Sequence, residues 1–119
     1  MLRKMFVSQN LPAEESDKIL RELKLGYINL KEKYFDLAKQ NFQLVLEFDP
    51  NCSEGFWGLA LANDNVANES ELYSDPAKHK NFINTSECQN ALKFAQEDQK
   101  NIYNDLLTKI YQINEGNNY

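Results

Sequence analysis

The sequence predicts an all-α fold of about five helices. Apolar residues between Ile19 and Leu61 recur at steps of three and four residues, which is the spacing of one helix face. The chain of 119 residues holds only four glycines and three prolines, too few for a strand-and-turn fold. A hydrophobic content of 42%, with seven Phe, six Tyr and one Trp, indicates a packed core rather than a disordered chain.

The length predicts one domain, because two ordinary domains would need a longer chain. Residues 1–12 lack a clear period and end at a proline, so we expect an N-terminal arm there. Residues 13–119 should form a single helical domain. Within it we expect repeat units over 13–62, an irregular connector over 63–85 and a pair of C-terminal helices over 86–115.

The first helix should begin between Ala13 and Ser16. Glu14, Glu15 and Asp17 follow this start, where acidic side chains favour the positive end of the helix dipole. Lys31 to Lys33 is the expected turn. The inner face of this helix is formed by residues at helical spacing: Ile19, Leu23, Gly26, Tyr27 and Leu30.

The second helix should run from Tyr34 to Phe48 and end at Asp49-Pro50, because the residue before a proline is pushed out of the helical region. Its inner stripe is Phe35, Ala38, Phe42 and Val45, and Leu37, Leu44 and Phe48 widen the apolar arc. Asn51 or Ser53 is the expected cap of the third helix. That helix is apolar nearly all round, with Phe56, Trp57, Leu59, Ala60 and Leu61, so it should lie between neighbours.

The pattern dissolves in the connector, which is rich in Asn and Ser, and we expect at most a helical turn around Glu69 to Tyr73. Ser86 is the expected cap of a short helix that has Cys88, Ala91, Leu92 and Ala95 on one side. The last helix should begin near Glu97 and stop at Gly116. Its stripe is Tyr103, Leu106, Leu107, Ile110 and Ile113.

The residues Leu25-Gly26, Phe35, Ala38, Phe42, Val45 and Asp49-Pro50 stand in the order and spacing of a packing signature. In this respect the chain resembles the tetratricopeptide repeat (TPR), a helix–turn–helix unit of about 34 residues. A second unit opens at Phe56-Trp57 and repeats the Leu-small pair at Leu59-Ala60, so the resemblance covers Ile19 to Asn63. It implies an α-α superhelix in which Gly26, Ala38 and Ala60 permit close helix crossing. Asn29 replaces an aromatic, Lys33 replaces a turn glycine, and the second unit lacks its return helix.

The segment from Asn90 to Tyr111 resembles segments that follow such units in proteins of low-GC Gram-positive bacteria. The TPR resemblance also implies a concave groove, lined by the first helix of each unit, in which peptides bind. The candidate groove residues are Leu20, Leu23, Tyr27, Leu30, Trp57 and Leu61. Leucines and aromatics suit an amphipathic helix as the ligand and do not form a carboxylate clamp. Alternatively, the protein's own helices, its arm or a second copy cover this apolar face. Trp57 is then a packing residue rather than an interface anchor.

The composition speaks against nucleic-acid and membrane partners. A net charge of −5 with scattered Lys and Arg lacks the basic face that nucleic acids require. No apolar run approaches the ~20 residues of a membrane span, and the N-terminus lacks a full secretory segment, so we expect a cytoplasmic protein. Cys52 and Cys88 fit that expectation as free thiols, although one disulfide between them is an alternative.

No residue set indicates catalysis, a cofactor or a metal site. The single histidine, His79, lies between two lysines in the connector, and we expect it to be solvated. The acidic clusters at Glu14 and Glu97 are explained by the helix dipole. The sequence therefore predicts a non-catalytic protein–protein interaction module, an adaptor or scaffold. The alternatives are a homodimeric structural domain and, less favoured, a small-molecule-binding domain or an enzyme.

Overall fold

The computed structural model describes residues 13–116, with side chains up to residue 110, and within this range it contains helices and no strand. The arm predicted for residues 1–12 lies outside the described residues. The all-α prediction is confirmed. In chain order the elements are α1 (Ala13–Lys31), α2 (Phe35–Phe48), α3 (Ser53–Asn63), α4 (Glu71–Ser74), the 3-10 turn η1 (Phe82–Asn84), α5 (Ser86–Phe94) and α6 (Glu97–Gly116).

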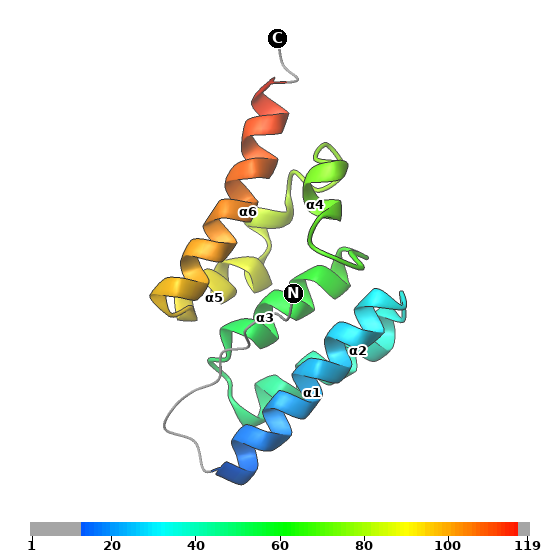
Figure 1. The fold of residues 1–119 in the computed structure, drawn as a ribbon, viewed down its shortest axis with the longest axis vertical. Coiled ribbons are helices and arrows are strands. Elements are labelled where there is room, and N and C mark those ends of the chain that lie inside the picture. The colour runs from blue at the N-terminus through cyan, green and yellow to red at the C-terminus, as the bar shows by residue number, and fades with distance from the viewer. Residues whose placement is uncertain (1–12, 117–119) are drawn as a thin grey trace.

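The helix α3 lies at the centre of the fold (Figure 1). On one side it packs against the antiparallel hairpin of α1 and α2, and on the other against α5. The expectation that this helix lies between neighbours is confirmed, because Trp57, Ala60 and Leu61 on its different sides are all buried. α5 packs against α3 although residues 64–85 separate the two helices in the sequence. The second neighbour of α3 thus comes from a segment far along the chain.

The two C-terminal helices have different neighbours. α5 packs against α3 and η1, whereas α6 packs against α4 (Figure 1). The expected C-terminal helices thus exist close to the predicted bounds, but each covers a different part of the core. In α6, Tyr103, Leu107 and Ile110 are buried, as the stripe predicted; the side chain of Ile113 lies outside the described residues.

Small residues stand where the helices approach most closely. Gly26, Ala38 and Ala60 are all buried, as predicted. A Cβ atom on Gly26 would lie 2.7 Å from the ring of Phe42, so only glycine fits there. Gly58, which the sequence did not single out, lies even closer to the same ring. One aromatic side chain of α2 is therefore held between a glycine of α1 and a glycine of α3.

Two helix ends share one backbone motif. After α1, the N–H of Tyr34 donates to the carbonyl of Asn29 and the N–H of Lys33 donates to the carbonyl of Leu30. This pairing is the Schellman motif, and Lys33 has a φ of 66°, in the left-handed region. The predicted turn at residues 31–33 is confirmed. After α3 the same motif places Asn65 at a φ of 56°.

The helix starts differ from the predicted caps. Cys52, rather than Asn51 or Ser53, is the N-cap of α3, and its side chain makes no capping hydrogen bond. The hydroxyl of Ser53 instead donates to the carbonyl of Ala91 on α5, at 2.5 Å. At α5 the cap is Thr85 rather than Ser86, because the Thr85 hydroxyl accepts from the N–H of Cys88.

The connector is irregular, as predicted, with α4 close to the expected helical turn. It nevertheless contributes to the core, because Val66, Leu72 and Phe82 are buried. In the part of the chain that the structure describes, no helix has the length and apolar character needed to span a bilayer.

Candidate functional site

The residues predicted to line a groove lie mostly inside the protein. Four of the six, Leu23, Leu30, Trp57 and Leu61, are at most 1% exposed. Leu20 and Tyr27 are half-buried. The apolar face of α1 is covered by α2 and α3 of the same chain, so an open groove formed by all six residues is not what the fold provides. The alternative expected from the sequence was burial against the chain's own helices, and it holds for Leu23, Leu30, Trp57 and Leu61.

Trp57 joins three parts of the core. Its indole ring stacks on Tyr103 of α6, with ring centroids 4.0 Å apart and planes 14° apart. It meets Phe82 of η1 edge-on at 5.4 Å. The indole N–H donates to Oε2 of Glu69 in the connector, at 2.9 Å. A buried Trp usually satisfies its N–H in this way, so Trp57 is a packing residue that attaches the connector and α6 to α3.

The half-buried Tyr27 meets a buried carboxylate on α3. Its hydroxyl donates to Oε2 of Glu54 at 2.5 Å, and Glu54 is only 1% exposed. The ring of Tyr27 packs edge-on against Phe42, with centroids 5.2 Å apart. A buried carboxylate requires hydrogen bonds because removal from water is costly. The pair therefore ties α1 to α3.

His79 is buried, and the prediction that it is solvated was wrong. It is 4% exposed, and its Nδ1 lies 2.5 Å from Oδ2 of Asp64, which directly follows α3. The connector folds back over the end of α3 and brings these two residues together, although 15 positions separate them. No local spacing could indicate this pair. It attaches the connector to the central helix.

Cys52 and Cys88 are thiols that form no disulfide, as predicted, and both are buried. Burial disfavours the thiolate and raises the pKa of each thiol to about 12. Both are therefore protonated at neutral pH, and a protonated thiol is a poor nucleophile and a poor metal ligand. Across residues 13–110, moreover, no three His, Cys, Asp or Glu side chains gather in a way that could hold a metal ion.

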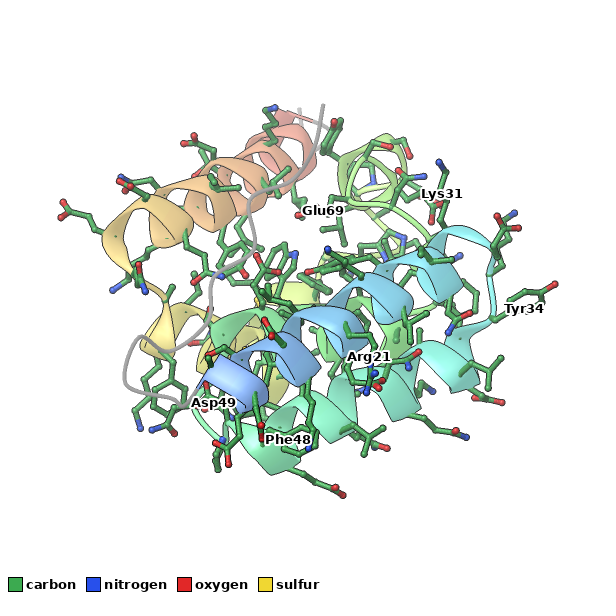
Figure 2. All side chains as sticks on the ribbon, turned by 60° about the horizontal axis from the view of Figure 1, so that its bottom comes forward. Arg21, Lys31, Tyr34, Phe48, Asp49 and Glu69 are labelled. Carbon is green, nitrogen blue, oxygen red and sulfur yellow. The ribbon has the colours of Figure 1, made fainter. Side chains whose placement is uncertain are left out.

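A set of exposed apolar side chains lies on the α1–α2 hairpin, on the side turned away from α3. We call this surface the outer face and define it by Leu25 and Ile28 of α1 with Leu37, Leu44 and Phe48 of α2. Their exposed fractions range from 36% for Phe48 to 57% for Ile28. Figure 2 shows the two helices in the foreground, with Tyr34 extending from the turn that joins them and Phe48 at the other end of α2.

The position of the outer face follows from helical spacing. Leu37 and Leu44 are seven residues apart and so lie on one side of α2, while Phe42 and Val45 of the same helix are buried. On α1, Leu25 lies between the buried Leu23 and Gly26 in sequence, but points to another side of the helix. The hairpin is therefore apolar on two sides, and α3 covers only one of them.

A polar ladder crosses the hairpin between the two halves of the outer face. The Asn29 amide donates to Oδ1 of Asn41 at 2.7 Å, and the Asn41 amide donates to Oε2 of Glu22 at 2.9 Å. Asn29 stands where the TPR pattern has an aromatic residue, and its partner on α2 accounts for it. Nearer the open end of the hairpin, the Lys18 ammonium lies 5.8 Å from the ring centroid of Phe48.

The sequence interpretation noted the outer-face residues of α2 only as a widening of the apolar arc. The sequence did contain a signal for this surface, because the apolar arc of α2 is too wide to be covered by a single neighbouring helix. It became informative once α3 was seen to cover the opposite side.

The chain was compared with protein-family models, with curated proteins and with solved structures, and no match was found. Function is therefore inferred from the geometry of the described residues.

Proposed function

We propose that this protein is a non-catalytic protein–protein interaction module and that the outer face is its contact surface. The observation that carries the proposal is the exposure of five large apolar side chains on two adjacent helices. These side chains lie on either side of the polar ladder, and large apolar side chains gathered on one exposed surface are typical of interaction sites. The outer face thus takes the role that the sequence interpretation gave to the groove.

The shape of this surface favours a helical partner. Two antiparallel helices present a shallow seam, with Leu25 and Ile28 on one side and Leu37, Leu44 and Phe48 on the other. An amphipathic helix recognises such a seam through apolar residues at steps of three and four. A TPR-like stack offers a further reason, because the terminal pair of a repeat array normally carries a polar outer surface, whereas this hairpin also exposes five large apolar side chains.

The chemistry of the buried groups supports a binding role rather than catalysis. The thiols of Cys52 and Cys88 are held protonated by burial, and His79 is engaged with Asp64. Two free cysteines also suit the reducing environment of the cytoplasm, where we propose that the protein acts.

The proposal is tested with a variant that charges the outer face, Leu25→Glu with Leu44→Glu. The matched control is Ile83→Glu with Ile102→Glu, because these two residues are 40% and 46% exposed and lie on η1 and α6. Wild type and both variants are immobilised, exposed to host extract, and the captured proteins are identified by mass spectrometry. The binding of each purified partner is then measured by calorimetry.

We expect wild type and control to bind the same partner and the outer-face variant to lose it, with the same helical circular dichroism for all three. Equal binding by all three proteins contradicts the proposal. So does the failure of the wild type to bind any protein, a second copy of itself included.

A further inference from the structure

We infer that the partner of the outer face is a second copy of this chain, packed so that α1 of each copy lies on α2 of the other. The inference rests on the proposed function and names the partner for the same surface. The resulting contact is an antiparallel four-helix bundle with a twofold axis parallel to the helices. The argument depends on the charges that border the outer face and on their levels along the hairpin.

From Lys18 onward, the exposed charges of α1 are opposite in sign to those of α2; the exposed acidic residues of α1, Glu14 and Asp17, lie before Lys18. Between Lys18 and Lys31, every exposed charged residue of α1 is basic: Lys18, Arg21, Lys24 and Lys31. On α2 every exposed charged residue is acidic: Asp36 and Glu47. A hairpin with one basic and one acidic edge is complementary to itself, because a copy turned over places the basic edge on the acidic one.

The contacts within the hairpin show which residues share a level. Lys18 lies over Phe48, the Gly26 backbone meets the Phe42 ring, and Asn29 bonds Asn41. On α1, Arg21 lies between Lys18 and Gly26. On α2, Glu47 lies between Phe48 and Phe42, so Arg21 and Glu47 are within about one helical turn of the same level. Lys31 is the last residue of α1 and Asp36 is the second residue of α2, so both lie near the turn that joins the two helices. Figure 2 shows Arg21 and Lys31 at different heights along α1, consistent with two separate levels.

Charge therefore selects one of two twofold arrangements. A twofold axis parallel to the helices leaves each residue at the same height along the hairpin and places α1 of one copy on α2 of the other. It sets Arg21 against the partner's Glu47 and Lys31 against the partner's Asp36. An axis across the helices reverses the levels and stacks like helices, so that Arg21 faces the partner's Lys31 and Asp36 faces the partner's Glu47. Like charges placed together oppose association, and these four residues face opposite charges only in the first arrangement.

The apolar residues fill the space between the charged edges. In the selected arrangement Leu25 and Ile28 of one copy pack on the outer-face residues of the partner's α2, in the manner of antiparallel bundles. The ladder of Glu22, Asn41 and Asn29 lies along the middle of this contact. Polar groups at such a seam specify register at some cost in stability.

The small area of the contact indicates a weak association between the two copies. α2 has 14 residues and is about 21 Å long, and two helices side by side are about 20 Å wide. The footprint is therefore roughly 400 Å² for each copy, below the ~800 Å² of a standard interface. We expect a dimer that exchanges with the monomer at micromolar concentrations, rather than a permanent one.

The test is sedimentation equilibrium of the full chain from about 1 μM to about 1 mM, at about 50 and about 500 mM NaCl. We expect a dimer whose dissociation constant rises with salt. Glu47→Lys should raise that constant about tenfold or more, and Arg21→Glu with Glu47→Lys should recover part of the loss. The matched control is Asp105→Lys, which makes the same charge change at an exposed site on α6 and should have no effect.

Disulfide trapping tests the arrangement itself, since the native thiols are buried. Arg21→Cys protein mixed with Glu47→Cys protein should form a cross-linked dimer under mild oxidation. Arg21→Cys mixed with Lys31→Cys should not, and the reverse result overturns the selected axis. A chain that stays monomeric at about 1 mM, or a dimer unaffected by Glu47→Lys, also overturns the inference. If a monomeric chain still binds another protein through the outer face, the proposed function stands and only the identity of the partner is wrong.

Discussion

The ring of Phe42 occupies the space that a Cβ atom on Gly58 would need. Phe42 belongs to α2 and is fully buried, and Gly58 is the point of α3 that passes over its ring edge. Gly26 of α1 approaches the same ring from another side. Three helices therefore meet at one aromatic side chain, and the distance between them depends on two missing methyl groups.

We predict that Gly58→Ala destabilises the protein by about 1–3 kcal/mol, although alanine is the better helix former by about 1 kcal/mol. The added methyl has to displace the Phe42 ring, which close packing on all sides resists. Gly55→Ala is the control, because its Cβ would meet flexible methyl groups of Leu46 and Val45 at 3.0 Å. Urea denaturation should show a clearly smaller loss for Gly55→Ala, and a larger one would contradict the account.

A double-mutant cycle with Phe42→Leu tests whether the ring is the cause. Phe42→Leu alone should destabilise through the cavity that it leaves. In that background Gly58→Ala should cost much less than in the wild type, because the new methyl enters vacated space. Strictly additive free energies of unfolding would show that the ring is not the obstacle.

We predict opposite outcomes for the same substitution at two neighbouring leucines. Leu23 is 0% exposed and Leu25 is 41% exposed. Leu23→Glu buries a carboxylate without a designed partner and should abolish the cooperative unfolding transition. Leu25→Glu should change stability by less than about 1 kcal/mol, since its side chain faces solvent in the monomer. Thermal unfolding followed by circular dichroism at low protein concentration measures the stability of both variants. A folded Leu23→Glu variant would mean that this face of α1 is not core.

We predict that Lys33→Gly stabilises the protein by about 0.5–1 kcal/mol. Lys33 has a φ of 66°, where a side chain is strained and glycine is not. The comparison is Asn65→Gly, at a φ of 56° in the same motif after α3. Asn tolerates the left-handed backbone region better than Lys does, so Asn65→Gly should stabilise the protein less than Lys33→Gly. Equal gains in urea denaturation would indicate that glycine acts through something other than this strain.

The two buried cysteines predict a loss of stability at alkaline pH. Each thiol has a pKa near 12 in the folded protein, against an ordinary value of 9.0. Between these values the unfolded chain releases thiol protons that the folded chain retains, so unfolding becomes more favourable as pH rises. Below pH 9 this contribution does not change with pH. A variant with Cys52→Ala and Cys88→Ala should lose stability less steeply between about pH 9 and about pH 11.

The same burial predicts slow modification of the thiols. An aromatic disulfide reagent at about pH 8 should label both cysteines only after denaturant is added. Rapid labelling of the native protein at either residue would show that its thiol is accessible, and the alkaline prediction would then fail as well.

The bounds of the long helices were predictable because each depends on nearby residues. Asp49-Pro50 ends α2 for a local steric reason, and Glu14 and Glu97 mark helix starts through the dipole. The caps at Cys52 and Thr85 were missed by one residue. At α3 the hydroxyl of Ser53 is engaged in a tertiary hydrogen bond to the carbonyl of Ala91.

The candidate site was less predictable. The groove residues were correctly recognised as apolar, but α3 and α6 bury Leu23 and Trp57 inside the molecule. The spacing of apolar residues shows which sides of a helix are apolar, but it does not show which of those sides another helix covers. His79 and Asp64 met only because the connector folds back.

From the order of its residues alone, this chain specifies that it is helical and where its main helices run. Those properties depend on interactions within one or two turns. Only the three-dimensional arrangement decided that α5 would complete the pairing of α3 and that the outer face of the α1–α2 hairpin would stay exposed. Both depend on contacts between segments distant in the chain, whose stability arises from the surface they bury together.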